Sequence, residues 1–149
     1  MSVVPPRISI PSAALSGAIA SVAYAGEMYL DIAITRNPLD DLQLLEGLLR
    51  RRKARFPILG MGAHLLNGAA LGVAYALIKP LLPGPNWLRG LSFGLLFVLG
   101  VWPLTPLLDR IHPLIRRGDL PMFNTPFALR QNIARHLVFG LVLGLLYRD

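Results

Sequence analysis

The segment His64–Tyr75 reads HLLNGAALGVAY, and His136–Tyr147, 72 residues further along the chain, reads HLVFGLVLGLLY. Both segments fit the pattern His-Leu-x-x-Gly-x-x-Leu-Gly-x-x-Tyr. Leucine and glycine are common in membrane helices, so the aligned histidine and tyrosine are the more informative matches. The repeat predicts a chain of two similar halves, each containing one such helix.

The composition indicates a membrane protein. Of the 149 residues, 54% are hydrophobic and only 15% are charged, whereas a soluble domain carries about 25% charged residues. The charges lie between long apolar runs, as in a chain that crosses a bilayer several times. The net charge of +7 comes from arginines that flank these runs, without the aromatic-interleaved basic surface of a nucleic-acid binder. We therefore expect the lipid bilayer, and not nucleic acid, as a partner.

Four apolar segments are long enough to cross a hydrocarbon core, which takes about 20 helical residues. The segments are residues 12–34, 59–82, 87–108 and 127–147. The Pro-Gly-Pro turn at 83–85 predicts that the second and third segments are antiparallel neighbours. The whole chain, residues 1–149, is predicted to be a single transmembrane domain, an all-α integral membrane four-helix bundle built from two parallel hairpin repeats.

The distribution of basic residues predicts the orientation. Eleven of the 15 Lys and Arg residues lie in the first and third loops or at the adjacent helix ends. The other four lie in the N-terminal tail, the second loop and the C-terminus. Because cytoplasmic loops are enriched in Lys and Arg, both long loops are predicted to be cytoplasmic and both termini outside.

An alternative interpretation treats the N-terminal region as a signal peptide. Arg7, the apolar run after it and the Ala-Tyr-Ala sequence at 23–25 have the order of such a peptide and its cleavage site. However, the apolar stretch continues to Ile34, and the first span completes the repeat. These features favour a membrane span.

The glycines of the repeat are spaced by four residues, together with the histidines, and therefore share one face of each helix. Small residues at this spacing let helices approach closely in lipid, so we expect these faces to pack against other helices. An alternative places a flat ring, haem or chlorophyll-like, against the glycines, with His64 and His136 as axial ligands. The predicted packing glycines are Gly60, Gly68, Gly72, Gly140 and Gly144.

Ionisable residues inside a membrane span are costly, and each is a functional hypothesis. Glu27 and Asp31 share one face of the first span, at a depth similar to that of Arg135 and the two histidines. We expect these groups to form one layer and to be paired with one another. Two alternatives are a metal site made by Glu27, His64 and His136 and a proton or ion relay through Glu27. The predicted buried polar residues are Glu27, Asp31, Asn67 and Arg135.

The first loop predicts a short amphipathic helix. Residues 37–55 read NPLDDLQLLEGLLRRRKAR, in which Asn37 can cap a helix over about 38–53. Its leucines share a face, so it is predicted to lie on the cytoplasmic leaflet. His112, in the third loop, is expected at the surface. The basic cluster is predicted to contact anionic lipid headgroups and consists of Arg50, Arg51, Arg52, Lys53 and Arg55.

The paired helices His64–Tyr75 and His136–Tyr147 resemble those of small uncharacterised bacterial four-span membrane proteins that form domains of unknown function. The resemblance implies a bacterial inner (cytoplasmic) membrane location and supplies no catalytic role to carry over. The sequence has no nucleophile elbow and no phosphate-binding glycine loop, so we do not expect an enzyme.

The small size and the small-residue faces favour a non-catalytic accessory or scaffold subunit of a larger membrane complex, which binds other membrane subunits or a second copy of itself. Two alternatives are a small transporter or ion- or proton-conducting oligomer that uses Glu27 and the paired histidines, and a carrier of haem, pigment or metal ligated by His64 and His136. No cofactor is assigned from the sequence.

Overall fold

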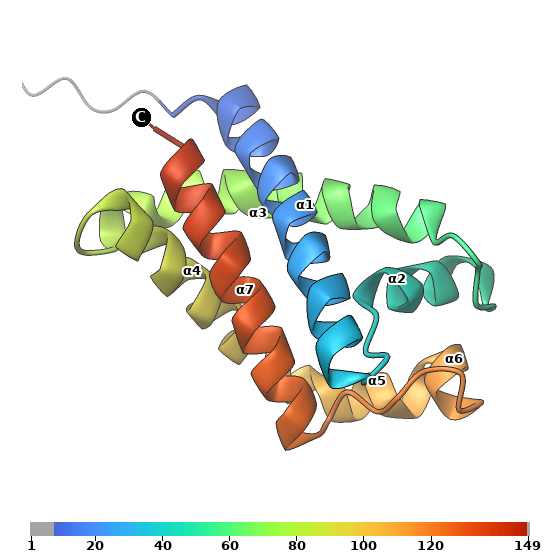
Figure 1. The fold of residues 1–149 in the computed structure, drawn as a ribbon. Helices are drawn as coiled ribbons and strands as arrows, with labels where there is room; N and C mark the ends of the chain where they lie inside the picture. The colour runs from blue at the N-terminus through green and yellow to red at the C-terminus, as the bar shows by residue number, and fades with distance from the viewer. Residues whose placement is uncertain (1–7, 149) are drawn as a thin grey trace, which may run out of the picture.

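The computed structural model describes residues 8–148 and consists of helices (Figure 1). The prediction of an all-α chain is therefore confirmed. The two 3-10 turns, Lys79–Leu81 and Trp102–Leu104, directly follow α3 and α4. The α-helices are α1 (Ile10–Thr35), α2 (Asp41–Arg50), α3 (Ile58–Ile78), α4 (Asn86–Val101), α5 (Thr105–Ile111), α6 (Pro113–Arg116) and α7 (Pro126–Leu146).

Within the described part of the chain, two helical segments are long and apolar enough to cross a membrane. They are Ile58–Leu81, which contains α3, and Asn86–Ile111, which contains α4 and α5. The helices α1 and α7 are also long but less apolar than α3, because they carry Glu27, Asp31 and Arg135. The two long helices that carry these ionisable residues are thus the ones whose composition is least typical of a membrane span.

Small residues set the pairing of the long helices. Gly68 and Gly72 of α3 lie against Gly17 of α1, and a Cβ atom built on Gly72 would stand 2.1 Å from the Ala13 carbonyl oxygen. Gly140 of α7 is equally close to α4, since its Cβ would stand 2.2 Å from the Gly90 carbonyl oxygen. The glycines therefore bring α1 against α3 and α4 against α7, and α1 also packs against α7.

The helices α3 and α4 follow each other in the chain without packing extensively against each other. The prediction that the turn at 83–85 makes them packed neighbours is wrong. The physical reason is that the small-residue face of each helix is turned towards a different partner, α1 for α3 and α7 for α4. Beyond the turn the two helices leave room for a cavity between them.

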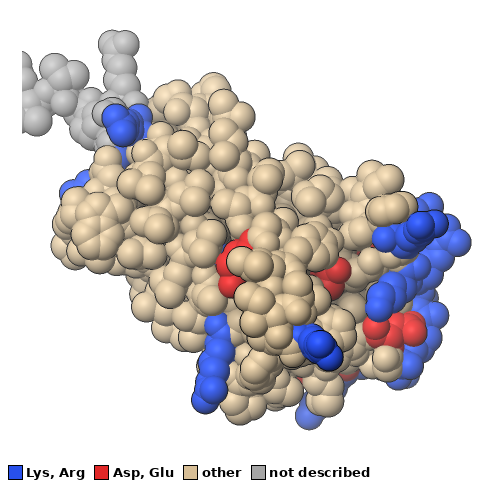
Figure 2. Space-filling view, in the orientation of Figure 1, with Lys and Arg blue, Asp and Glu red and all other residues tan. Residues whose placement is uncertain are grey.

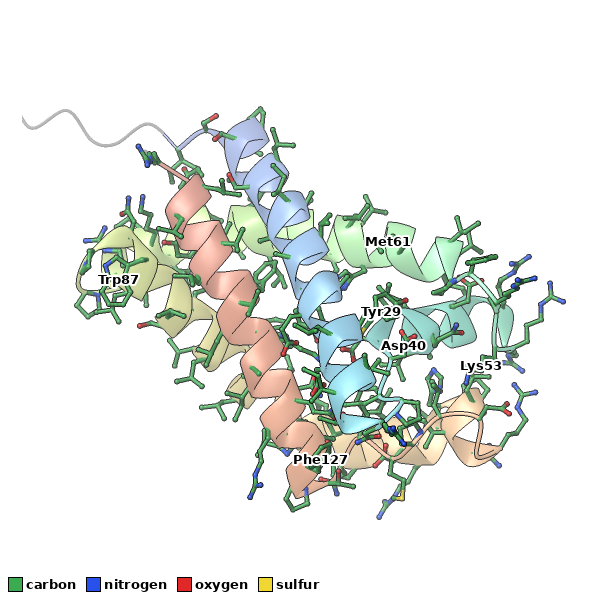
Figure 3. The ribbon with its side chains drawn as sticks, viewed as in Figure 1. Tyr29, Asp40, Lys53, Met61, Trp87 and Phe127 are labelled. Carbon is green, nitrogen blue, oxygen red and sulfur yellow. The ribbon has the colours of Figure 1, made fainter. Side chains whose placement is uncertain are left out.

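The amphipathic helix of the first loop is shorter than predicted and has another cap. It begins at Asp41, and the Asp40 carboxylate accepts a hydrogen bond of 2.9 Å from the Gln43 backbone N–H (Figure 3). Asn37, the predicted cap, lies before the helix and donates its side-chain N–H to Gln131. Burial raises the pKa of the Asp40 carboxyl above its ordinary value, so this cap becomes neutral at a higher pH than an exposed aspartate.

The inward face of α2 is partly polar, in contrast to the predicted leucine face. Glu46 is fully buried and accepts a hydrogen bond of 2.8 Å from the backbone N–H of Gly60, in the first turn of α3. Leu42 packs into the core, whereas Leu48 and Leu49 are exposed. The helix is held against α3 because its carboxylate satisfies an N–H group that the start of a helix leaves unpaired.

The third loop contains short helices and a buried histidine. His112 is fully buried, and its Nε2 lies 2.9 Å from the Leu44 carbonyl oxygen. Its Nδ1 accepts a hydrogen bond from the Leu114 N–H at the start of α6. The expectation of a surface histidine is therefore wrong, because this ring joins the third loop to α2.

The two long connections meet at one end of the molecule, opposite the first turn of α1 and the last turn of α7 (Figure 1). Gly47 of α2 and Leu114 of α6 are in contact there. Lys and Arg side chains are concentrated at this end, where α2 and α6 lie (Figure 2). Much of the remaining visible face is uncharged, with a few acidic atoms in its middle.

Candidate functional site

Arg135 of α7 is the centre of a buried ion cluster. Its side chain is fully buried. Its Nη2 lies 2.9 Å from Asp31 Oδ2, its Nη1 lies 2.9 Å from Asp41 Oδ2, and its Nε lies 3.7 Å from Glu27 Oε2. Three carboxylates from α1 and α2 thus surround one guanidinium group. Such a buried charge is tolerated because it is paired and hydrogen-bonded.

Polar neighbours extend this cluster into a layer across three helices. The Gln131 side-chain N–H donates to Asp31. The Tyr24 hydroxyl donates to Asp41 at 2.8 Å. Since these groups come from α1, α2 and α7, the layer joins the two glycine-paired halves and the first loop.

The structure brings together three of the residues that the sequence analysis singled out, namely Glu27, Asp31 and Arg135. It adds Asp41 and Tyr24, which the sequence analysis did not include in the layer. Tyr24 could have been found, because it precedes Glu27 by three positions and Asp31 by seven and therefore shares their helix face. Asp41 had no such signal, since only the tertiary structure folds α2 against α1.

The two repeat histidines lie on either side of Tyr24. The ring centroids of His64 and His136 are 5.0 and 5.1 Å from that of Tyr24. His64 Nε2 lies 3.1 Å from the Ser21 carbonyl oxygen, and His136 Nδ1 lies 2.8 Å from the Asn132 carbonyl oxygen. Because a carbonyl only accepts, these nitrogens are assigned the proton. The second nitrogen of each neutral ring is then a hydrogen-bond acceptor.

The geometry does not support the metal and flat-ring interpretations of the histidines. Glu27 faces Arg135, and among residues 8–148 no group of three His, Asp or Glu side chains is placed to hold a metal ion. A flat ring cannot lie against the glycines, because the backbones of α1 and α4 already occupy those faces at contact distance.

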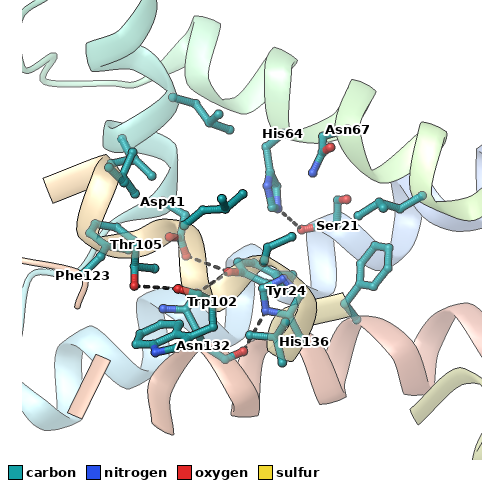
Figure 4. Close-up of a pocket in the computed structure, with 18 residues that line it drawn as sticks. Ser21, Tyr24, Asp41, His64, Asn67, Trp102, Thr105, Phe123, Asn132 and His136 are labelled. Atoms are coloured by element: carbon teal, nitrogen blue, oxygen red, sulfur yellow. Dashed lines mark hydrogen bonds between the residues drawn. The ribbon is translucent and has the colours of Figure 1, made fainter. Parts of the chain in front are cut away.

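A cavity of about 320 Å³ lies beside the histidines, between α3 and α4 (Figure 4). Its polar lining comes mainly from α1, α3 and α7, with Tyr24, His64 and His136 facing it. The opposite wall, from α4 to α5, is largely apolar. The apolar lining consists of Leu44, Leu45, Leu71, Val98, Val101, Trp102, Leu104, Leu108, Phe123 and Phe139.

Asn67 was predicted to be a buried polar residue, and this is wrong. It lines the cavity but is exposed. The reason is the same divergence of α3 and α4, which leaves this face of α3 without a covering helix. The Asn67 side chain therefore stands at the open side of the cavity.

The basic residues predicted to contact lipid headgroups are all exposed. They begin at Arg50, the last residue of α2, and lie at the end of the molecule where the long connections meet, whereas Asp41 of the buried layer is the first residue of that helix.

Replacing Tyr24 by phenylalanine tests the link between the cavity and the ion cluster. The change removes the hydroxyl that donates to Asp41, and a hydrogen bond to a charged group contributes about 1.5–3 kcal/mol. We expect the free energy of unfolding in detergent to fall by that amount. Tyr29→Phe is the matched control, because Tyr29 lies on the same helix and is 43% exposed. Equal stability of the two variants would contradict this role of Tyr24.

These features define a class of protein, an all-helical chain with a buried ion cluster beside an amphipathic cavity. The chain belongs to DUF6789, a family of unknown function whose model matches residues 8–149. No curated protein and no solved structure matches the chain. The expectation of a family of unknown function is confirmed, and the family supplies no catalytic or binding role to transfer.

Proposed function

We propose that the chain is a multi-pass protein of the bacterial inner membrane in which α1, α3, α4 and α7 cross the bilayer. The outward face of α1 supports this proposal, although that helix also carries acidic residues. Leu15, Ile19, Val22, Leu30 and Ile34 form a row at helical spacing, each at least 46% exposed. A large exposed apolar surface of this kind marks a membrane or partner contact.

The two most apolar segments support the same location. Only 28% of the apolar stretch of Ile58–Leu81 and 22% of that of Asn86–Ile111 is buried within the chain. The core helix of a soluble protein would be mostly covered. The cations gathered around α2 and α6 support a cytoplasmic position for that end, and hence both termini outside.

The pairing of helices supports the proposed duplication. Gly68 meets Gly17 in the first half, and Gly140 meets Gly90 in the second. Each half therefore consists of one helix of the repeat and the long helix before it. These are α1 and α3 in the first half and α4 and α7 in the second. Two parallel hairpins arranged in this way are a known plan among membrane proteins.

For the function, we propose that the cavity binds a small neutral amphiphile from the membrane, with no chemical reaction. The cavity carries this proposal, because its 320 Å³ fall in the usual size range of ligand sites and it combines an apolar wall with a few polar groups. Its carboxylate, Asp41, is already paired with Arg135, which favours an uncharged ligand. The acceptor nitrogens assigned to His64 and His136 favour a ligand with a hydroxyl group.

Trp102 allows a direct test of this proposal. It lines the cavity, whereas Trp87 lies near the turn that joins α3 and α4 (Figure 3). In a Trp87→Phe background, a bromine-substituted long-chain alcohol should quench Trp102 fluorescence with saturation. The matching bromoalkane without the hydroxyl should bind more weakly.

Leu71→Phe should fill the cavity and weaken binding of the alcohol about tenfold, a difference of about 1.4 kcal/mol. Leu77→Phe, on the exposed side of the same helix, is the control and should bind normally. Quenching that does not saturate, or that is the same in both variants, would contradict the proposed site.

A second candidate function is that of an accessory subunit whose cleft receives a helix of a partner protein. The observation in its favour is that the open side of the cavity presents the exposed residues Asn67, Val101 and Leu104. The packing glycines no longer argue for it, because they are used within the chain. Extraction of native membranes in mild detergent should then yield the chain in a larger complex. Recovery of the chain alone, at its own oligomer mass, would contradict this candidate.

A further inference from the structure

Two chain segments that lie far apart in the sequence form one cationic surface. The first starts at the last residue of α2 and the second at the last residue of α6 (Figure 2). Lys53 donates to the Asp119 carbonyl oxygen across this surface at 3.5 Å. All its cations are exposed. They are Arg50, Arg51, Arg52, Lys53, Arg55, Arg116 and Arg117.

Within this surface a notch of about 330 Å³ is lined by Arg51, Pro113, Arg116 and Arg117. Arg117 joins the two segments that line it, because its guanidinium donates to the carbonyl oxygens of Arg51 and Pro113 and pairs with Asp119 at 3.6 Å. The guanidinium groups of Arg51 and Arg116, by contrast, have no hydrogen-bond or ion-pair partner among the described residues. The notch thus presents two uncompensated cations from two segments.

The surroundings of the notch decide what kind of anion fits. Leu48, Leu49, Phe56 and Ile58 lie next to the basic cluster in the sequence, and they are 50%, 61%, 68% and 75% exposed. An acidic soluble partner would leave these large apolar side chains in water. A phospholipid surface accommodates both features, since its phosphates meet the cations while the apolar side chains enter the interface.

We propose that Arg51 and Arg116 bind the phosphate of an anionic phospholipid headgroup in this notch. This inference rests on the proposed membrane location. It does not depend on the cavity or its ligand. The fork of a guanidinium group matches two phosphate oxygens, and two such groups that line one notch can hold one headgroup. The sequence alone indicated a basic stretch, whereas the notch requires α6.

The test uses the full chain in mild detergent, with phosphatidylglycerol or phosphatidylcholine added and bound lipid measured by native mass spectrometry. The unmodified protein should prefer phosphatidylglycerol. The double variant Arg51→Gln/Arg116→Gln should lose about 25-fold in affinity for it, which corresponds to about 1 kcal/mol for each charge. The control Arg110→Gln/Arg130→Gln removes two other exposed arginines and the same net charge, and it should keep the preference.

Three results would overturn the proposal. An equal loss in both double variants would mean that only general charge attraction acts. An unchanged preference in the Arg51→Gln/Arg116→Gln variant would place the headgroup elsewhere. Binding of inorganic phosphate at the notch without any preference among lipids would assign the site to a soluble phosphate compound. Release of the unmodified chain from membranes by alkaline carbonate would instead contradict the membrane location itself.

Discussion

Replacing Arg135 by glutamine is expected to lower the free energy of unfolding by about 3–5 kcal/mol, the cost of removing one partner from a buried ion pair. The loss is large because Asp31, Asp41 and Glu27 would remain together without the cation that separates them. The guanidinium also joins α7 to both α1 and α2. Denaturant or thermal unfolding of the detergent-solubilised protein would measure the effect.

Arg130→Gln is the matched control, because Arg130 lies on the same helix but is exposed. It should change the stability by no more than about 0.5 kcal/mol. Asp41→Asn added to Arg135→Gln should recover part of the loss, since it removes one uncompensated charge. If Arg135→Gln and Arg130→Gln have the same free energy of unfolding, the ion cluster does not hold the three helices together.

Replacing Gly140 by alanine should separate α7 from α4. The new Cβ would stand 2.2 Å from the Gly90 carbonyl oxygen, and backbone cannot move aside as a flexible side chain can. We expect a loss of about 3 kcal/mol, at the upper end of the usual cost of overpacking. Unfolding in detergent and a shift in gel-filtration volume are the measurements.

Gly100→Ala, on α4 of the same helix pair, is the control and should not lower the stability. A Cβ on Gly100 meets nothing within 4 Å, and alanine favours a helix by up to about 1 kcal/mol over glycine. This variant should therefore be as stable as the unmodified protein or slightly more stable. If Gly140→Ala behaves in the same way, the close approach of α4 and α7 is not needed for the fold.

Periodicity carried much of the information that the sequence contained about this protein. Spacing by four placed Gly68 and Gly72 on one helix face, and the same rule placed Glu27 beside Asp31. Local patterns of this kind depend only on helix geometry, so they can be read without a structure. They do not say which helix lies opposite, and so Gly17 and Gly90, the partners of the packing glycines, were not found.

The errors fell where a long-range contact overrode a local signal. The leucines of the first loop suggested a helix with one apolar face, yet Glu46 turns inward to meet the N–H of Gly60. His112, in a loop rich in proline and glycine, looked exposed, and its bond to Leu44 buries it. In both cases the hydrogen-bond partner is a backbone group elsewhere in the chain, which no neighbouring residue reveals.

The amino-acid order alone therefore determined the long helices, their small-residue faces and the shared face of Glu27 and Asp31, because these follow from composition and the 3.6-residue period. Tertiary structure alone decided that α3 and α4 turn to different partners, that Asp41 joins Arg135, and that Arg116 stands beside Arg51. The cavity and the cationic notch both result from these long-range contacts. Each is a space between elements that the chain brings together from afar, so no stretch of sequence encodes it locally.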